Sequence, residues 1–120
     1  INPLALRHTA VNAAAAGVAV ESKLGDALAC TTGDFDVIVC NPPYLTDDAA
    51  RVYRHGGDRL GRALSLRIAE EALPRLAPGG RLLLYTGVAI VDGRDPFIEE
   101  LAPVLEAAGC TWSYREIDPD

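Results

Sequence analysis

The sequence predicts an α/β fold, a doubly wound and mostly parallel sheet with helices on both faces. Helix-like and strand-like segments alternate along the 120 residues, and no repeat or linker divides them, so we expect a single domain, residues 1–120. The runs 35–40 and 81–87 are mostly apolar, which is typical of strands buried inside a parallel sheet. A hydrophobic content of 49% is enough to form the core of such a domain.

The first part of the chain is expected to hold a helix and a short strand. Residues 3–16 form the helix, with Asn2 as its N-cap and Gly17 as its stop. Residues 18–24, "VAVESKL", alternate between apolar and polar side chains, which predicts the strand. The dipeptide Gly25–Asp26 then turns the chain toward the first buried strand.

The second part continues the alternation. A helix is expected at residues 60–76, followed by the second buried strand at 81–87. Asp95 caps a further helix, in which Pro103 is expected to produce a kink. Residues 110–117 alternate again and predict a last strand.

Both ends of the sequence are unusual for such a sheet. The chain opens directly on a capped helix and stops soon after a strand-like run. A sheet of three or four strands without neighbours for its first strand would leave an unprotected edge and apolar surface. We therefore expect the chain to be part of a longer domain that continues beyond both ends.

The charge of the chain is unevenly distributed. A net charge of −6 argues against indiscriminate binding to nucleic acid, which depends on neutralising phosphates with basic side chains. The segment 46–67, however, holds five arginines against three aspartates. Two interpretations stay open: a solvated helix face with ordinary salt bridges, or a basic surface beside a binding site.

Composition also limits where the protein works. No run approaches the roughly 18 to 20 apolar residues of a membrane span, and the N-terminus lacks the regions of a signal peptide, so we expect a cytoplasmic protein without membrane contact. The cysteines are odd in number, form no CxxC pair and are expected to be reduced and buried. We predict no metal site. The residues concerned are Cys30, Cys40, Cys110, His8 and His55.

The stretch "NPPY", residues 41–44, carries the clearest chemistry. It follows a buried strand, where the ligand sites of doubly wound sheets lie. The side-chain oxygen of Asn41 and the carbonyl of Pro42 are two acceptors, held by rigid rings, and Tyr44 offers a flat face for stacking. These groups suit a planar group that carries an NH2. Hydrogen bonds to both of its N–H groups favour the pyramidal nitrogen that can attack an electrophile.

These residues resemble the (Asn/Asp/Ser)-Pro-Pro-(Tyr/Phe/Trp) motif of class I S-adenosylmethionine-dependent methyltransferases that methylate amino nitrogens. Within that class the chain looks most like the small-methyltransferase domain of HemK-like protein-glutamine N5 methyltransferases. Two further stretches, "GDAL" at 25–28 and "LAPGGRLLLYTG" at 76–87, match the same pattern. The resemblance covers nearly the whole chain and implies an incomplete, C-terminal portion of a Rossmann-like methyltransferase fold.

The resemblance implies an enzyme that uses S-adenosyl-L-methionine. It assigns catalysis to Asn41, Pro42 and Tyr44, with Pro43 binding substrate. It places Asp26 on the adenine amine of the cofactor. The cofactor-binding residues that it implies are Ile1, Asp26, Ala27, Leu28 and Asn41. The family's glycine-rich first loop and ribose-binding acid are absent, so we expect this segment alone to be inactive and the residue before Ile1 to be acidic.

The substrate is less well defined. The resemblance favours a protein glutamine amide, as in the Gly-Gly-Gln loop of translation release factors. Methylation of N6 of adenine or N2 of guanine in RNA or DNA stays open, because 85–87 read Tyr-Thr-Gly where HemK-like enzymes have Glu-x-Gly. A non-catalytic binding module with a degenerate methyltransferase fold is a further alternative. The oligomeric state stays undetermined.

Several nearby residues are interpreted as structural. A lone loop histidine, His55, is not needed as a base, since the nitrogen loses its proton after methyl transfer. Gly56, Gly57 and Gly61 suggest a loop that closes over substrate, with weak order expected at 53–59. The dipeptide Thr86–Gly87 is interpreted as a strand end and its turn.

Overall fold

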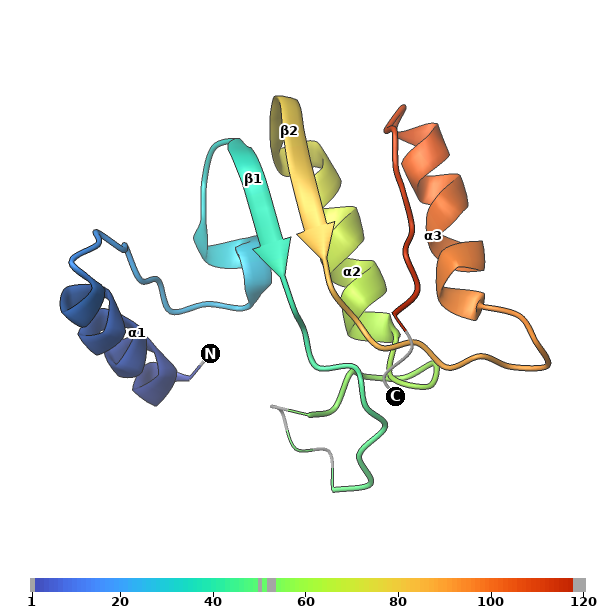
Figure 1. Ribbon diagram of the computed structural model, residues 1–120, viewed down its shortest axis with the longest axis horizontal. Coiled ribbons are helices and arrows are strands. Elements are labelled where there is room, and N and C mark those ends of the chain that lie inside the picture. The colour runs from blue at the N-terminus through green and yellow to red at the C-terminus, as the bar shows by residue number, and fades with distance from the viewer. Residues whose placement is uncertain (1, 50, 52–53, 118–120) are drawn as a thin grey trace. The chain divides into compact units, whose positions relative to one another are not determined.

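A computed structural model describes residues 2–49, 51 and 54–117. The chain divides into two compact units, Ile1–Asp34 and Phe35–Asp120, which are described separately (Figure 1). Within the described ranges no helix is long and apolar enough to cross a membrane. The prediction of a single domain remains a prediction.

The first unit contains a regular helix, α1 (Pro3–Ala16), and a short 3-10 helix, η1 (Ala27–Cys30). The predicted ends of α1 are confirmed: the Asn2 side chain accepts a hydrogen bond from the Leu4 N–H at 3.0 Å, and Gly17 ends the helix with a φ of 67°. The predicted strand at 18–24 is wrong, because these residues form no β pairing within the described chain. Alternation alone does not make a strand without a neighbour.

The second unit is built on two parallel strands, β1 (Phe35–Cys40) and β2 (Leu76–Leu84). Val39 lies opposite Leu83 in the register, and the Tyr85 N–H donates to the Cys40 carbonyl at 3.0 Å just beyond the strands. The α/β class with parallel pairing is therefore confirmed. The second strand begins earlier than predicted, since it includes the Ala-Pro-Gly-Gly stretch and a register shift near Phe35.

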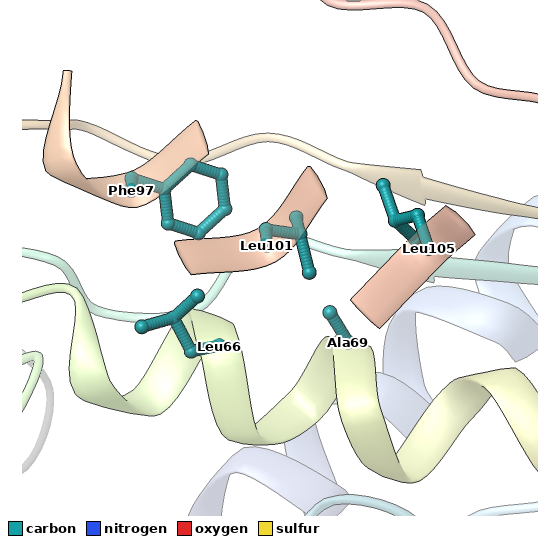
Figure 2. Close-up of a cluster of buried hydrophobic side chains, with 5 residues drawn as sticks. All are labelled: Leu66, Ala69, Phe97, Leu101 and Leu105. Atoms are coloured by element: carbon teal, nitrogen blue, oxygen red, sulfur yellow. The ribbon is translucent and has the colours of Figure 1, made fainter. Parts of the chain in front are cut away.

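Two helices cover one face of this sheet: α2 (Ala63–Ala72), continued by the 3-10 helix η2 (Leu73–Arg75), and α3 (Pro96–Ala107). Figure 2 shows the buried side chains between the two helices. Leu82 and Leu84 of β2 pack against this cluster. The cluster consists of Leu66, Ala69, Phe97, Leu101 and Leu105. Within this unit both helices thus lie on the same face of the sheet.

The opposite face of the strands exposes apolar side chains. Val37 is 55% exposed, Val39 72% and Leu83 57%. The expectation that both faces of β1 are buried is therefore wrong for this unit. A hydrophobic run shows that burial of a strand would be favourable. Whether the strand is buried depends on other segments that pack over it.

The last helix and the chain end are joined through Asp95. Its carboxylate caps α3 by accepting hydrogen bonds from the N–H groups of Phe97 (2.9 Å) and Ile98 (3.3 Å), as predicted, and the helix continues through Pro103. The Tyr114 hydroxyl donates to the same carboxylate, and burial together with this bond raises the pKa of Tyr114 to about 12. The predicted strand at 110–117 is wrong, since the described residues there pair with no strand.

Candidate active site

The Asn-Pro-Pro-Tyr turn lies at the carboxyl end of β1, where the chain leaves the sheet (Figure 1). The prolines end the ladder because neither has an N–H to donate. The turn borders a cavity of about 240 Å³. The cavity is lined by Asn41, Pro42, Pro43, Tyr44, Leu45 and Arg54. The structure thus brings the four predicted substrate-site residues together around one space.

Both predicted acceptors belong to residues that line the cavity, and neither has a hydrogen-bond donor among the described residues. The Asn41 side chain is exposed, and no hydrogen bond to its amide exists within the described part of the chain. The carbonyl of Pro42 is likewise without a donor among the described residues, although Pro42 itself is buried. Two acceptors on a stiff backbone, beside a cavity, can take both N–H groups of one planar NH2.

The aromatic ring of Tyr44 lies directly against Gly87. A Cβ atom built on Gly87 would stand 2.4 Å from Cδ2 of Tyr44, so only glycine permits this approach. The preceding residue is anchored to α2, because the hydroxyls of Thr86 and the fully buried Ser65 are 2.8 Å apart. Thr86 and Gly87, just after β2, therefore support the ring of Tyr44. The interpretation of this dipeptide as a simple strand end missed that role.

We predict that Gly87→Ala displaces the Tyr44 ring and lowers methyl transfer by about tenfold or more, with little loss of stability, since misplacing a positioning group costs rate. Gly87 has an ordinary φ, so the added methyl group meets mainly the ring. Steady-state kinetics and thermal melting of the full-length protein test this. Unchanged kcat in a correctly folded Gly87→Ala protein contradicts a role for the ring position.

Two further glycines lie against the backbone of Tyr44. A Cβ on Gly56 would lie 2.6 Å from Cα of Tyr44, and one on Gly61 would lie 2.1 Å from its carbonyl oxygen. The Leu45 N–H donates to the Arg54 carbonyl at 3.1 Å, and the Gly56 N–H donates to the Leu45 carbonyl at 2.9 Å. These glycines thus allow close packing of backbone against the turn.

The predicted mobility of 53–59 stays a prediction, and Tyr53 lies outside the described residues. The close packing of Gly56 explains a glycine there without any loop motion. Spacing in the sequence cannot separate these two uses of glycine, because both require the same absent side chain.

The loop after the turn is held by a buried carboxylate, Asp47. Its oxygens accept hydrogen bonds from the backbone N–H of Arg51 at 2.8 Å and from the Arg51 guanidinium. Its own N–H donates to Nδ1 of His55 at 3.3 Å. The bonds from the side chain and backbone of Arg51 lower the pKa of Asp47 from 3.8 to about 2, and the charge of Arg54 acts in the same direction. His55 therefore braces the loop through a hydrogen bond.

This network predicts a pH dependence of stability. The pKa of Asp47 is lower in the folded protein than its ordinary value of 3.8. Its contribution to the free energy of unfolding is therefore complete about one pH unit above 3.8, and it is lost as the pH falls toward 2. We expect Asp47→Asn to melt at a lower temperature than the original protein at pH 7, with the difference shrinking between pH 5 and pH 2 on the scale of these pKa values. Parallel melting curves over this range provide the measurement. A difference independent of pH contradicts the ion pair.

Most arginines of the segment 46–67 form ion pairs. Arg51 pairs with Asp47 and Arg67 with Glu71. Glu100 of α3 receives both Arg59 and Arg62, at 2.6 and 2.5 Å, and these bonds, that of Arg62 foremost, lower the pKa of Glu100. Four of the five arginines thus have carboxylate partners, which favours the interpretation of ordinary salt bridges for them.

The residues that the resemblance assigns to the cofactor adenine belong to the first unit. Asp26 and Ala27 are exposed, Leu28 is half-buried, and Ala27 has a φ of 46°, a left-handed value rarely adopted outside glycine. Gly25 lies so close to Cys30 that a Cβ would clash with it at 2.3 Å. This tight turn presents the Asp26 carboxylate at the surface. Ile1 lies outside the described residues, and the cofactor role of all these residues stays a prediction.

The cysteines form no disulfide. Cys30, Cys40 and Cys110 are free and half-buried, and burial raises the pKa of the Cys40 thiol. In the described ranges no three His, Cys, Asp or Glu side chains come close enough to hold a metal ion.

Comparison with known proteins gives consistent matches. A family model described as a methyltransferase small domain matches residues 1–90. A release factor glutamine methyltransferase of Cereibacter sphaeroides is 38% identical over 124 residues, covering 91% of this chain and 41% of the relative. One of Deinococcus radiodurans is 38% identical over 130 residues, covering 100% and 43%. One of Koribacter versatilis is 34% identical over 106 residues, covering 77% and 38%.

The chain therefore spans about two fifths of the length of these relatives. No solved structure matches it.

Proposed function

Because the chain belongs to the methyltransferase small domain family, we propose that it is part of an S-adenosylmethionine-dependent N-methyltransferase that acts on a protein glutamine amide. The predicted resemblance to HemK-like class I methyltransferases is confirmed, and the α/β unit with its parallel strands is part of their Rossmann-like fold. One observation carries the proposal: two acceptors that have no donor among the described residues border the same cavity as an aromatic ring.

The proposed chemistry follows from these groups. The side-chain oxygen of Asn41 and the carbonyl of Pro42 accept the two N–H groups of the substrate amide, and Tyr44 stacks on its plane. This arrangement stabilises a nitrogen whose lone pair has left conjugation with the carbonyl, which is the form that attacks a methyl group. The methylated nitrogen is cationic and acidic, so it releases its proton without a strong base.

The residues present fit the proposed cofactor. S-adenosylmethionine would supply an electrophilic methyl group. The exposed carboxylate of Asp26 suits an adenine amine, and Leu28 offers an apolar contact beside it. The resemblance assigns Asn41 to both the cofactor site and the substrate turn.

The protein substrate is favoured over nucleic acid by charge. Nucleic-acid binding needs several unpaired basic side chains, and four of the five arginines near the turn are neutralised by carboxylates. The curated relatives described above carry the name release factor glutamine methyltransferase, so a release-factor-like protein is the proposed partner.

The test uses the full-length protein. Calorimetry with S-adenosylmethionine measures cofactor binding, and incubation with tritiated cofactor and cell extract shows which class of molecule is labelled. We expect binding, and label in protein glutamine. Absence of cofactor binding overturns the proposal that the protein is a methyltransferase. Label in RNA or DNA would show that the substrate is a nucleic-acid base and not a glutamine amide. Cofactor binding without methyl transfer to any amide or base favours a binding module.

A further inference from the structure

Three successive residues between the Asn-Pro-Pro-Tyr turn and α2 have left-handed backbone conformations. Arg59, Leu60 and Gly61 have φ values of +59°, +57° and +82°. Glycine adopts such values readily, but a residue with a side chain does so at a cost, so Arg59 and Leu60 need support from the surrounding structure. We call residues 59–61 the left-handed segment; it lies just before α2 (Figure 1).

A carboxylate of α3, that of Glu100, supports the left-handed segment at both ends. Its Oε2 accepts a hydrogen bond from the Arg59 guanidinium at 2.6 Å. Its Oε1 accepts two from the guanidinium of Arg62, the residue directly after the segment, at 3.0 and 2.5 Å. The same Arg62 guanidinium donates to the Arg59 carbonyl at 2.5 Å. Glu100 therefore holds Arg62 in place to bond the backbone of the segment.

The neighbouring residue on α3, Glu99, makes a more exposed ion pair. It pairs with Arg94 at 2.7 Å, and the two side chains are 42% and 72% exposed. In the pair between Glu100 and Arg62 the side chains are only 34% and 15% exposed. A less exposed pair is less screened by water and salt, so it holds its partners more firmly. Glu99 thus offers a matched reference for Glu100 on the same helix.

The left-handed segment lies against the backbone of the turn. A Cβ on Gly61 would stand 2.1 Å from the carbonyl oxygen of Tyr44, and a Cβ on Gly56 would stand 2.0 Å from the carbonyl oxygen of Gly61. The Gly56 carbonyl in turn accepts the Leu64 N–H of α2 at 2.9 Å. Since closely packed backbone atoms leave little free space, a shift of Gly61 is expected to move Tyr44.

We propose that Glu100 is a positioning residue for methyl transfer, which keeps the Asn-Pro-Pro-Tyr turn in its reactive geometry through Arg62 and the left-handed segment. The role rests on the proposed function and adds a residue more than 50 positions beyond the turn to it. Glu100 does not line the cavity, so it acts on the substrate site only through the residues that it holds.

The kinetic test uses the full-length protein, S-adenosylmethionine and a peptide that contains Gly-Gly-Gln. Glu100→Gln is expected to lower kcat roughly tenfold, because a small displacement of positioning groups costs rate. Glu99→Gln removes the same charge from the adjacent position and should leave kcat unchanged. Thermal melting verifies that both variants fold. An equal loss of kcat in the two variants overturns the proposal.

A conservative variant separates positioning from a general loss of helix stability. Aspartate has a lower helix propensity than glutamine, so a role in helix stability alone predicts more damage from Glu100→Asp than from Glu100→Gln. The proposal predicts the opposite order of kcat, because aspartate keeps the negative charge that Arg62 needs. A higher kcat for Glu100→Gln than for Glu100→Asp contradicts it.

Hydrogen exchange tests the support of the turn without measuring activity. The N–H groups of Leu45 and Gly56 donate to the carbonyls of Arg54 and Leu45 beside the turn. We expect both amides to exchange several-fold faster in Glu100→Gln than in Glu99→Gln, because local opening becomes easier. The Tyr85 N–H, which bonds the Cys40 carbonyl next to the strands, should exchange at the same rate in both variants.

The two measurements distinguish failure of this role from failure of the proposed function. Unchanged exchange at Leu45 and Gly56 in Glu100→Gln overturns the positioning role, whether or not the protein transfers methyl groups. If the original protein methylates no glutamine, the proposed function fails. Faster exchange in Glu100→Gln would then still show that Glu100 holds the turn.

Discussion

Asn41→Ala is expected to lower the methyl-transfer rate of the full-length protein by about 100-fold or more, the range seen when one preorganised hydrogen-bonding group of an active site is removed. The Asn41 amide is exposed and has no partner within the described chain, so its removal breaks no structural hydrogen bond. The loss should therefore fall on kcat, with little change in melting temperature.

Two further variants sharpen this prediction. Asn41→Asp keeps an accepting oxygen at the same place and should retain more activity than Asn41→Ala. Asn12→Ala removes another exposed asparagine, in α1, and should leave kcat unchanged. A normal kcat for Asn41→Ala contradicts the role of the turn in holding the reactive nitrogen. Rapid-mix assays with radiolabelled cofactor measure the rates.

Gly61→Ala is expected to destabilise the protein by about 3 kcal/mol or more, which is at the upper end for a single substitution. Gly61 has a φ of +82°, which strains any residue with a side chain. In addition, the new Cβ would stand 2.1 Å from the carbonyl oxygen of Tyr44. Both atoms belong to rigid parts of the chain, so the clash moves the turn itself. Chemical denaturation and a methyl-transfer assay should therefore both show a defect.

Gly93→Ala separates the two causes. Gly93 also has a positive φ, +75°, but no atom lies within 4 Å of its missing Cβ. It should lose only the cost of the backbone conformation, about 1 kcal/mol. Equal losses for the two variants would show that contact with Tyr44 contributes nothing at Gly61.

Helix ends and the functional turn were predictable because their signals are local. The caps at Asn2 and Asp95 depend on a side chain and on N–H groups two or three residues further along, so the sequence contains both partners of each bond. The Asn-Pro-Pro-Tyr turn is stiffened by its own rings. Its position after β1 followed from the apolar run before it.

The failed predictions concern partners that are distant in the sequence. The runs 18–24 and 110–117 have strand-like alternation, yet neither pairs within the described chain. The strand β1 has the apolar residues of a fully buried strand, yet Val39 is exposed. A strand requires an edge to pair with and a layer to cover it, and neither requirement is written in its own residues.

The α/β class, the capped helices and the acceptor turn could be predicted without a structure, because each depends on neighbours along the chain. Which glycine supports Tyr44 and which carboxylates pair with the arginines depends on the folded arrangement. Gly87 meets the ring across more than 40 residues, and Glu100 neutralises Arg59 and Arg62 from α3. These contacts join residues that are far apart along the chain, so they depend on positions in space that no local pattern contains.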